Sequence, residues 1–223
     1  MNTDDLITRL STGVRPVRVL APPWQRAAYW LACCAAYVAA VVGWAWLRRG
    51  SLAVNVDPPY VVQQIALLAT AYGAAVAAFS SVVPGRADRA AIGPLVSAVV
   101  LMAALAWGCV NDFRELSTLG VGQETDWPCV LSITLGGAAL WGIAMWMLKD
   151  GAPLTPGMTS LLAGAGALSI ANIEACITRG HAFTVTIVLW HGVATVVVLA
   201  FLTRAGFKSL RWQHSIPGRR SRG

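Results

Sequence analysis

The chain has 223 residues, of which 57% are hydrophobic and only 12% are charged. Soluble domains carry about twice that share of charged residues, so the composition excludes an ordinary soluble protein and indicates an integral membrane protein. The formal net charge of +7 is compatible with nucleic-acid binding, but basic flanks of membrane spans also set topology and contact anionic lipid, so we expect no direct nucleic-acid partner.

Six apolar runs approach or reach the roughly 20 residues that a helix needs to cross a bilayer. They are continuously apolar and rich in Ala, Leu and Gly, whereas the strands of a membrane barrel alternate apolar and polar residues. The first run lacks the cleavage site of a signal peptide and is kept as a span. The sequence therefore predicts an all-α membrane protein, a six-transmembrane-helix bundle with short loops and spans at 28–47, 60–83, 91–110, 128–148, 158–177 and 183–202.

Orientation follows from the Lys and Arg residues, which membrane insertion retains on the cytoplasmic side. Four basic residues fall on the opposite side: Arg48, Arg49, Arg114 and Arg179. The other thirteen of the 17 share the side of both termini: Arg9, Arg15, Arg18, Arg26, Arg86, Arg89, Lys149, Arg204, Lys208, Arg211, Arg219, Arg220 and Arg222. We expect a multi-pass protein of the bacterial inner membrane, with a cytoplasmic N-terminal segment at 1–27, the bundle at 28–202 and a basic cytoplasmic C-terminal tail at 203–223.

Small residues within the spans, such as Gly136, Gly137 and the run 163–167, predict close helix packing. Four tryptophans near the predicted span ends are interpreted as interface anchors: Trp24, Trp30, Trp127 and Trp212. Asn172, Glu174 and His191 lie within spans and need polar partners inside the bundle. A small transporter or channel that uses these three residues is the alternative function.

The cysteines fall into two groups. Cys33 and Cys34 lie in the first span, whereas Cys109, Cys129 and Cys176 lie at the outer ends of three different spans. Thiols gathered at an oxidising face can form a disulfide or bind a soft metal, although free cysteines are more often apolar packing residues. His181, in the short outer loop after Cys176, is an auxiliary candidate base or ligand, as is His191.

Enzyme signatures are missing from the sequence. A CxxC motif is absent, which argues against a membrane thiol oxidoreductase, and there is neither an HExxH motif nor a Gly-Lys-Ser/Thr phosphate loop. We therefore expect no enzymatic activity and no cofactor.

The N-terminal segment predicts a short amphipathic helix. Thr3 or Asp4 can cap it, Asp4 and Asp5 suit its first turn, and Leu6, Ile7, Leu10 and Val14 share one face. A helix this short is ordered by a partner surface, which is either another protein or the lipid headgroups. Pro16, Pro22 and Pro23 then impose extended chain before the first span.

Short motifs in a fixed order resemble the NrsF-type (negative regulator of sigma F) anti-sigma factors. They cover almost the whole chain: TDDLI, Leu10, PVR at 16–18, APPWQRA, VPGR at 83–86, WGC at 107–109, WPC at 127–129, KDGAPLTP, and Cys176 followed by Phe183, Trp190 and His191.

The resemblance implies a six-span inner-membrane protein that sequesters an extracytoplasmic-function (ECF) sigma factor and releases it under oxidant or heavy-metal stress. It implies that the sensing residues, and any metal ligands, are Cys129 and Cys176. Many members have a histidine where this chain has Ala175, which favours thiol oxidation over metal binding and leaves His181 as a substitute ligand. It also implies that residues 3–18 hold the sigma factor, through Thr3, Asp4, Asp5, Leu6, Ile7, Arg9, Leu10, Pro16 and Arg18.

Overall fold

The computed structural model describes residues 3–12, 20–50, 58–83, 92–116, 127–149, 151, 155–179 and 188–210. The regular structure in this part of the chain is all helical, and six of its helices are long and apolar enough to cross a membrane. The elements are α1 (Thr3–Ser11), α2 (Pro23–Arg49), α3 (Pro58–Ser80), α5 (Ile92–Leu116), α6 (Trp127–Leu148), α7 (Pro156–Arg179), the π-helical turn η1 (Val188–Gly192) and α9 (Val193–Leu210).

Proline marks the start of four long helices. Pro23, Pro58 and Pro156 are the first residues of α2, α3 and α7, and Pro128 is the second residue of α6. Proline suits a first turn because its fixed φ is helical and the missing N–H has no intrahelical acceptor there. At the other end of α2, Gly50 adopts a left-handed φ of 73° and its N–H bonds to the Trp46 carbonyl at 2.7 Å, which closes the helix.

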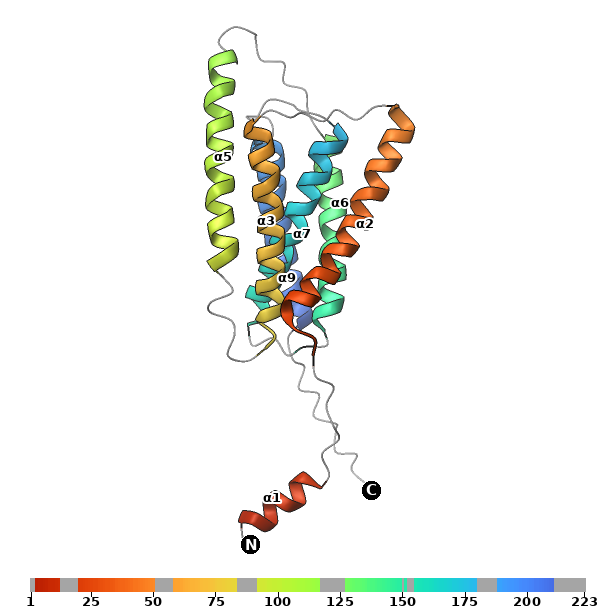
Figure 1. Cartoon of the computed structure of the whole chain (residues 1–223), viewed down its shortest axis with the longest axis vertical. Coiled ribbons are helices and arrows are strands. Elements are labelled where there is room, and N and C mark those ends of the chain that lie inside the picture. Colours follow the sequence, from red (N-terminus) through yellow and green to blue (C-terminus); the bar gives the residue numbers. More distant parts are fainter. Residues whose placement is uncertain are drawn as a thin grey trace, which may run out of the picture.

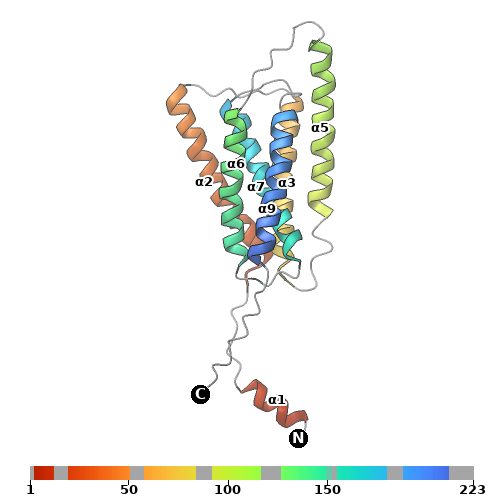
Figure 2. The same cartoon turned by 180° about the vertical axis from the view of Figure 1, so that it is seen from behind.

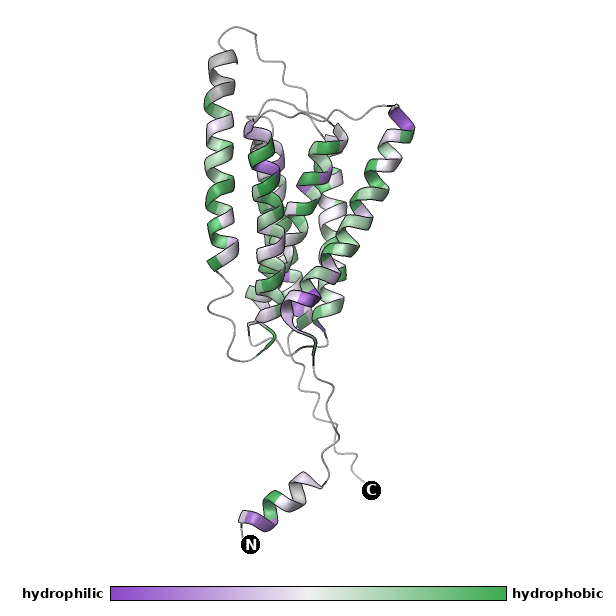
Figure 3. Cartoon of the chain, in the orientation of Figure 1, coloured by the Kyte–Doolittle hydropathy of each residue, from purple (hydrophilic) through white to green (hydrophobic). Residues whose placement is uncertain are grey.

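The six long helices run alternately up and down (Figure 1). The end at which α2 begins and α9 ends is called here the tail end, and the end at which α6 begins and α7 ends is called the cysteine end. Figure 2, from behind, shows the same order across the bundle, with α5 at one edge, α2 at the other and α7 between them. In Figure 3 the long helices are green over most of their length, as a lipid-facing bundle requires.

Helix α7 forms the centre of the bundle and packs against α2, α3, α6 and α9. It is the most deeply buried of the six spans. Its glycines and alanines permit this, since a Cβ at Gly166 would lie 3.2 Å from the Ala71 carbonyl oxygen of α3. The small-residue run at 163–167 therefore lies at helix contacts, as expected from the sequence.

Side-chain hydrogen bonds tie α7 to its neighbours. The Ser81 and Thr159 hydroxyls share a hydrogen bond of 2.7 Å beside α3, and the Ser160 hydroxyl donates to the Leu202 carbonyl of α9 at 3.0 Å. Nearer the cysteine end, the Asn172 amide donates to the Thr195 hydroxyl of α9 at 3.0 Å. Such bonds each contribute about 0.6 kcal/mol on average in membrane proteins, so several acting together fix the helix positions.

The last long helix ends later in the chain than predicted. The run 183–202 was expected to cross the membrane, but the membrane-length helix covers Trp190–Leu210, and 180–187 lie outside the described residues. In the sequence, the cations Arg204 and Lys208 look as if they follow the end of a span. In the structure both are exposed on α9, whose other face buries Leu202, Gly206 and Leu210. Long basic side chains can reach the headgroups from such positions.

Helix α1 lies apart from the bundle on the side of the tail end (Figure 1). The predicted helix is present, with Asp4 and Asp5 in its first turn, while Val14 of the predicted apolar face lies outside the described residues. Its Leu6 and Ile7 side chains are 41% and 58% exposed. The apolar face that Leu6 and Ile7 form on α1 is therefore exposed.

Replacing Gly206 with Ala tests the contact between α7 and α9. The new methyl group would overlap the Ser160 side chain and approach Trp141, so we expect the free energy of unfolding to fall by about 1–3 kcal/mol. The control is Gly142→Ala, at a position with open space around it. Thermal unfolding in detergent should separate the two variants, and equal midpoints would contradict this packing.

Candidate functional site

Cys129 and Cys176 both lie at the cysteine end, as the topology predicted. Cys129 is in the first turn of α6 and Cys176 in the last turn of α7, and the two helices pack together. Both side chains are buried, with 2% and 3% of their surface exposed, and neither cysteine is in a disulfide. Burial limits the access of an oxidant to either thiol.

A buried carboxylate lies in the contact between α6 and α7 near the cysteine end. The Glu174 side chain is 1% exposed and accepts a hydrogen bond from the Ser132 hydroxyl of α6 at 2.7 Å. Its other oxygen accepts from the Thr178 hydroxyl at 3.2 Å. These donors meet the expectation that Glu174 needs a partner within the bundle.

The end of α2 closes the same region. Arg49 donates a hydrogen bond to the Thr178 carbonyl in the last turn of α7. A cation at a helix C-terminus satisfies an unpaired carbonyl and is favoured by the helix dipole. Arg48 and Arg49 are among the few basic residues on the side opposite the termini. One of them, Arg49, thus contacts another helix of the bundle.

Cys176 and Glu174 lie on different sides of α7. Two residues along a helix turn by about 200°, so Cys176 points away from the face that meets Ser132. Gln64 and Tyr60 of α3 are the neighbours of its thiol. Movement of the thiol region would therefore affect α3 as well as α6.

The other cysteines are separated from this pair. Cys109 lies on α5, which packs chiefly against α3 and is separated by it from α6 (Figures 1 and 2). Cys33 is exposed on α2 and Cys34 is buried in the core. Cys129 and Cys176 are thus the cysteines that two packed helices bring to one end.

His191 lies within the last candidate span, Trp190–Leu210, near its start. Its side chain is buried in the π-helical turn η1. The adjacent Trp190 packs against Trp127 of α6, with ring centroids 6.0 Å apart. The turn therefore adjoins the end of α6 that carries Cys129, while His181 lies outside the described residues.

A metal site receives no support from the described part of the chain, where His, Cys, Asp and Glu side chains form no group of three or more that could hold an ion. Two thiolates alone can still bind a soft metal. Of the predicted sigma-factor contacts, Pro16 and Arg18 are outside the described residues, as are the side chains of Arg9 and Leu10.

Sequence reasoning missed the polar contacts at the tail end. Trp30 was interpreted as an interface anchor, but it is 1% exposed and its indole N–H donates to the Leu140 carbonyl of α6 at 3.1 Å. Arg26, placed in the tail by its charge, is buried and donates to the Met147 carbonyl of α6. Their spacing of four residues, one helical turn, was the available signal.

The geometry defines a six-span helical membrane protein with a buried polar and thiol cluster at one end and an uncovered amphipathic helix beyond the other. Residues 10–212 match the family model described as negative regulator of sigma F, NrsF, so the chain belongs to that family. Its class is that of an anti-sigma factor, a regulatory protein whose partner is a sigma factor. No curated protein and no solved structure matches the chain.

Replacing Ser132 with Ala tests the Ser132–Glu174 contact. Losing the interhelical bond leaves one carboxylate oxygen without that donor, so we expect the free energy of unfolding to fall by about 1 kcal/mol. Thr134→Ala is the matched control, because the Thr134 hydroxyl donates to the Val130 carbonyl of its own helix. An equal loss of stability in both variants would show that the Glu174 contact contributes nothing specific.

Proposed function

We propose that this protein is an anti-sigma factor of the bacterial inner membrane that holds an ECF sigma factor with its N-terminal segment and releases it when Cys129 and Cys176 are oxidised. In this proposal the tail end faces the cytoplasm and the cysteine end faces the periplasm, as the Lys and Arg distribution indicates. The observation that carries the proposal is the family membership together with the uncovered face of α1.

The exposed side chains of α1 support a protein partner. Leu6 and Ile7 are adjacent apolar residues on a helix of nine residues, too short to persist alone in water. Helices of this kind bind by placing apolar residues in a groove, while charges at the rim determine orientation. Asp4 and Asp5 supply such charges. The family match begins at residue 10, so the assignment of residues 3–9 rests on this helix.

The proposed input is oxidation of the two buried thiols. Disulfide formation removes two protons and two electrons from the thiols, and an oxidant such as diamide takes them up as its N=N bond becomes a hydrazine N–N bond. Joining the first turn of α6 to the last turn of α7 would change the contact in which Ser132 meets Glu174. Capture of a soft metal by the two thiolates is the second form of the same input.

The oxidised state must hold the sigma factor less tightly than the reduced state. A tenfold weaker affinity corresponds to about 1.4 kcal/mol of coupling between the two ends of the bundle. This is comparable to the contribution of one or two buried interhelical hydrogen bonds. The polar contacts of the bundle are therefore large enough to carry the signal.

Replacing Leu6 and Ile7 with Ala tests the tail. Truncating two buried interface side chains should weaken sigma-factor binding at least about tenfold, because each such truncation costs about 1–2 kcal/mol. Co-purification of the sigma factor with the full-length protein measures the effect.

The matched control is Thr12→Ala, one residue beyond the end of α1, where the hydroxyl donates to the Thr8 carbonyl. Unchanged retention in the double Ala variant would sink the tail assignment. Loss of binding in Thr12→Ala as well would point to the helix itself instead of its apolar face.

Replacing Cys129 and Cys176 with Ser tests the sensor. Repression of a sigma-dependent reporter should persist, since serine preserves the size of each side chain, while induction by diamide should be lost. Cys33→Ser, at an exposed position on α2, is the control and should respond normally. Normal induction in the double Ser variant would remove the two cysteines from the mechanism.

A further inference from the structure

Two side chains of α2 join the start of that helix to the tail half of α6. Arg26 donates to the Met147 carbonyl, and Trp30 donates to the Leu140 carbonyl at 3.1 Å. The donors are one turn apart on α2 and the acceptors are two turns apart on α6, so each pair shares one helix face. The helices run in opposite directions, and the residue nearer the start of α2 meets the residue nearer the end of α6.

Both donors are buried in the core. The Arg26 guanidinium also lies 4.8 Å from the ring centroid of Phe79 on α3, and the Trp30 ring comes within 3.4 Å of a Cβ position at Gly166 on α7. A buried guanidinium that loses its acceptor is costly, because lipid supplies no replacement. These two residues therefore follow the α6 carbonyls if α6 shifts.

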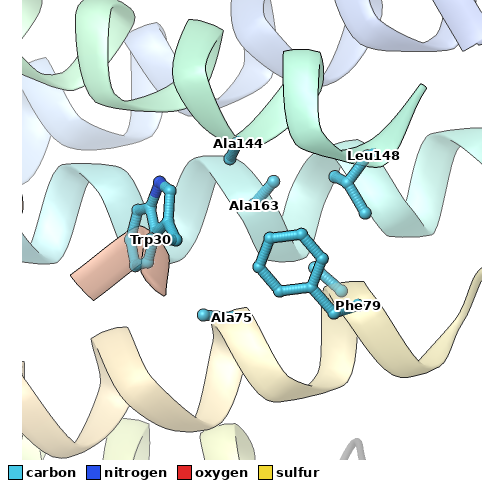
Figure 4. Close-up of a pocket in the computed structure, with 7 residues that line it drawn as sticks. Trp30, Ala75, Phe79, Ala144, Leu148 and Ala163 are labelled. Carbon is cyan, nitrogen blue, oxygen red and sulfur yellow. The ribbon is translucent and has the colours of Figure 1, made fainter. Parts of the chain in front are cut away.

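The surroundings of the Trp30 ring are closely packed and apolar. Figure 4 shows its ring between α3 and α6, with the nitrogen toward α6. An apolar cavity too small for a water molecule lies beside the ring and is lined by Trp30, Phe79, Leu148 and four alanines. The side chains that line this cavity are apolar, so the Leu140 carbonyl of α6 is the acceptor that fixes the orientation of the indole.

Helix α6 spans the distance between the sensor and this contact. Its first turn carries Cys129, and the acceptor carbonyl of Met147 lies about 27 Å further along the helix axis. At the start of α2, Pro22 is the N-cap, with an extended ψ of 143°, and Pro23 is the first helical residue, so two prolines restrict the backbone where the N-terminal segment joins the helix. A tilt at the start of α2 therefore changes the direction in which that segment leaves the membrane.

We infer that Arg26 and Trp30 are positioning residues that couple α6 to the N-terminal segment, so that a displacement of α6 at Cys129 changes the presentation of α1. This inference rests on the proposed function for its biological meaning. Its physical content is the coupling of α6 to the start of α2, which can be measured without a sigma factor.

The test is hydrogen–deuterium exchange of backbone amides 24–31 in the full-length protein in lipid nanodiscs, with and without diamide. The wild-type protein should change its exchange rate by about threefold or more on oxidation. Trp30→Phe keeps an aromatic ring but removes the N–H donor, and Arg26→Gln removes the cation. In both variants the ratio of the exchange rates with and without diamide should be close to one. Trp141→Phe is the matched control, because it removes an indole bond between α6 and Ser160 of α7, and it should keep the response.

Three results would overturn the coupling: no response in the wild type, a full response in Trp30→Phe, or an equal loss in Trp141→Phe. If Arg26→Gln does not fold, Trp30→Phe alone decides. Sigma-factor retention is measured on the same samples. A preserved exchange response without any sigma-factor binding would contradict the proposed function and leave the coupling standing.

Discussion

The burial of α7 is the constraint on which the bundle depends. Lipid tails are as apolar as the side chains that they would replace, so helices in a membrane associate through close packing and hydrogen bonds. Glycine and alanine let α7 approach its neighbours, and Thr159, Ser160, Asn172 and Glu174 each bond to a residue beyond it. The positions of α3, α6 and α9 are thus all defined relative to one helix.

Much of this fold follows from hydropathy, because a bilayer demands long apolar helices whatever the tertiary contacts are. The number of spans and the central packing of the small-residue run at 163–167 were predictable for that reason. The end of the last helix was predicted too early, because Arg204 and Lys208 look the same in sequence whether they follow a helix or lie on its exposed side. Only the packing of Leu202, Gly206 and Leu210 distinguishes the two cases.

The candidate site was predictable in part. The shared end of Cys129 and Cys176 follows from topology, and the resemblance gave them their role. The partner of Glu174 did not follow, since Ser132 is one of many hydroxyl residues and lies 42 positions away in the sequence. Trp30 was misinterpreted because an indole suits both the headgroup region and a buried contact that offers a carbonyl acceptor.

The depth at which the two thiols lie has a kinetic consequence. A thiol exposed to 2% or 3% reacts only while the helix ends are transiently open, so its oxidation rate is proportional to the open fraction as well as to the oxidant concentration. A brief pulse of oxidant would then leave most molecules unreacted, whereas sustained exposure would convert them. In the proposed mechanism, burial of the two thiols would make the response depend on the duration of oxidant exposure as well as on its intensity.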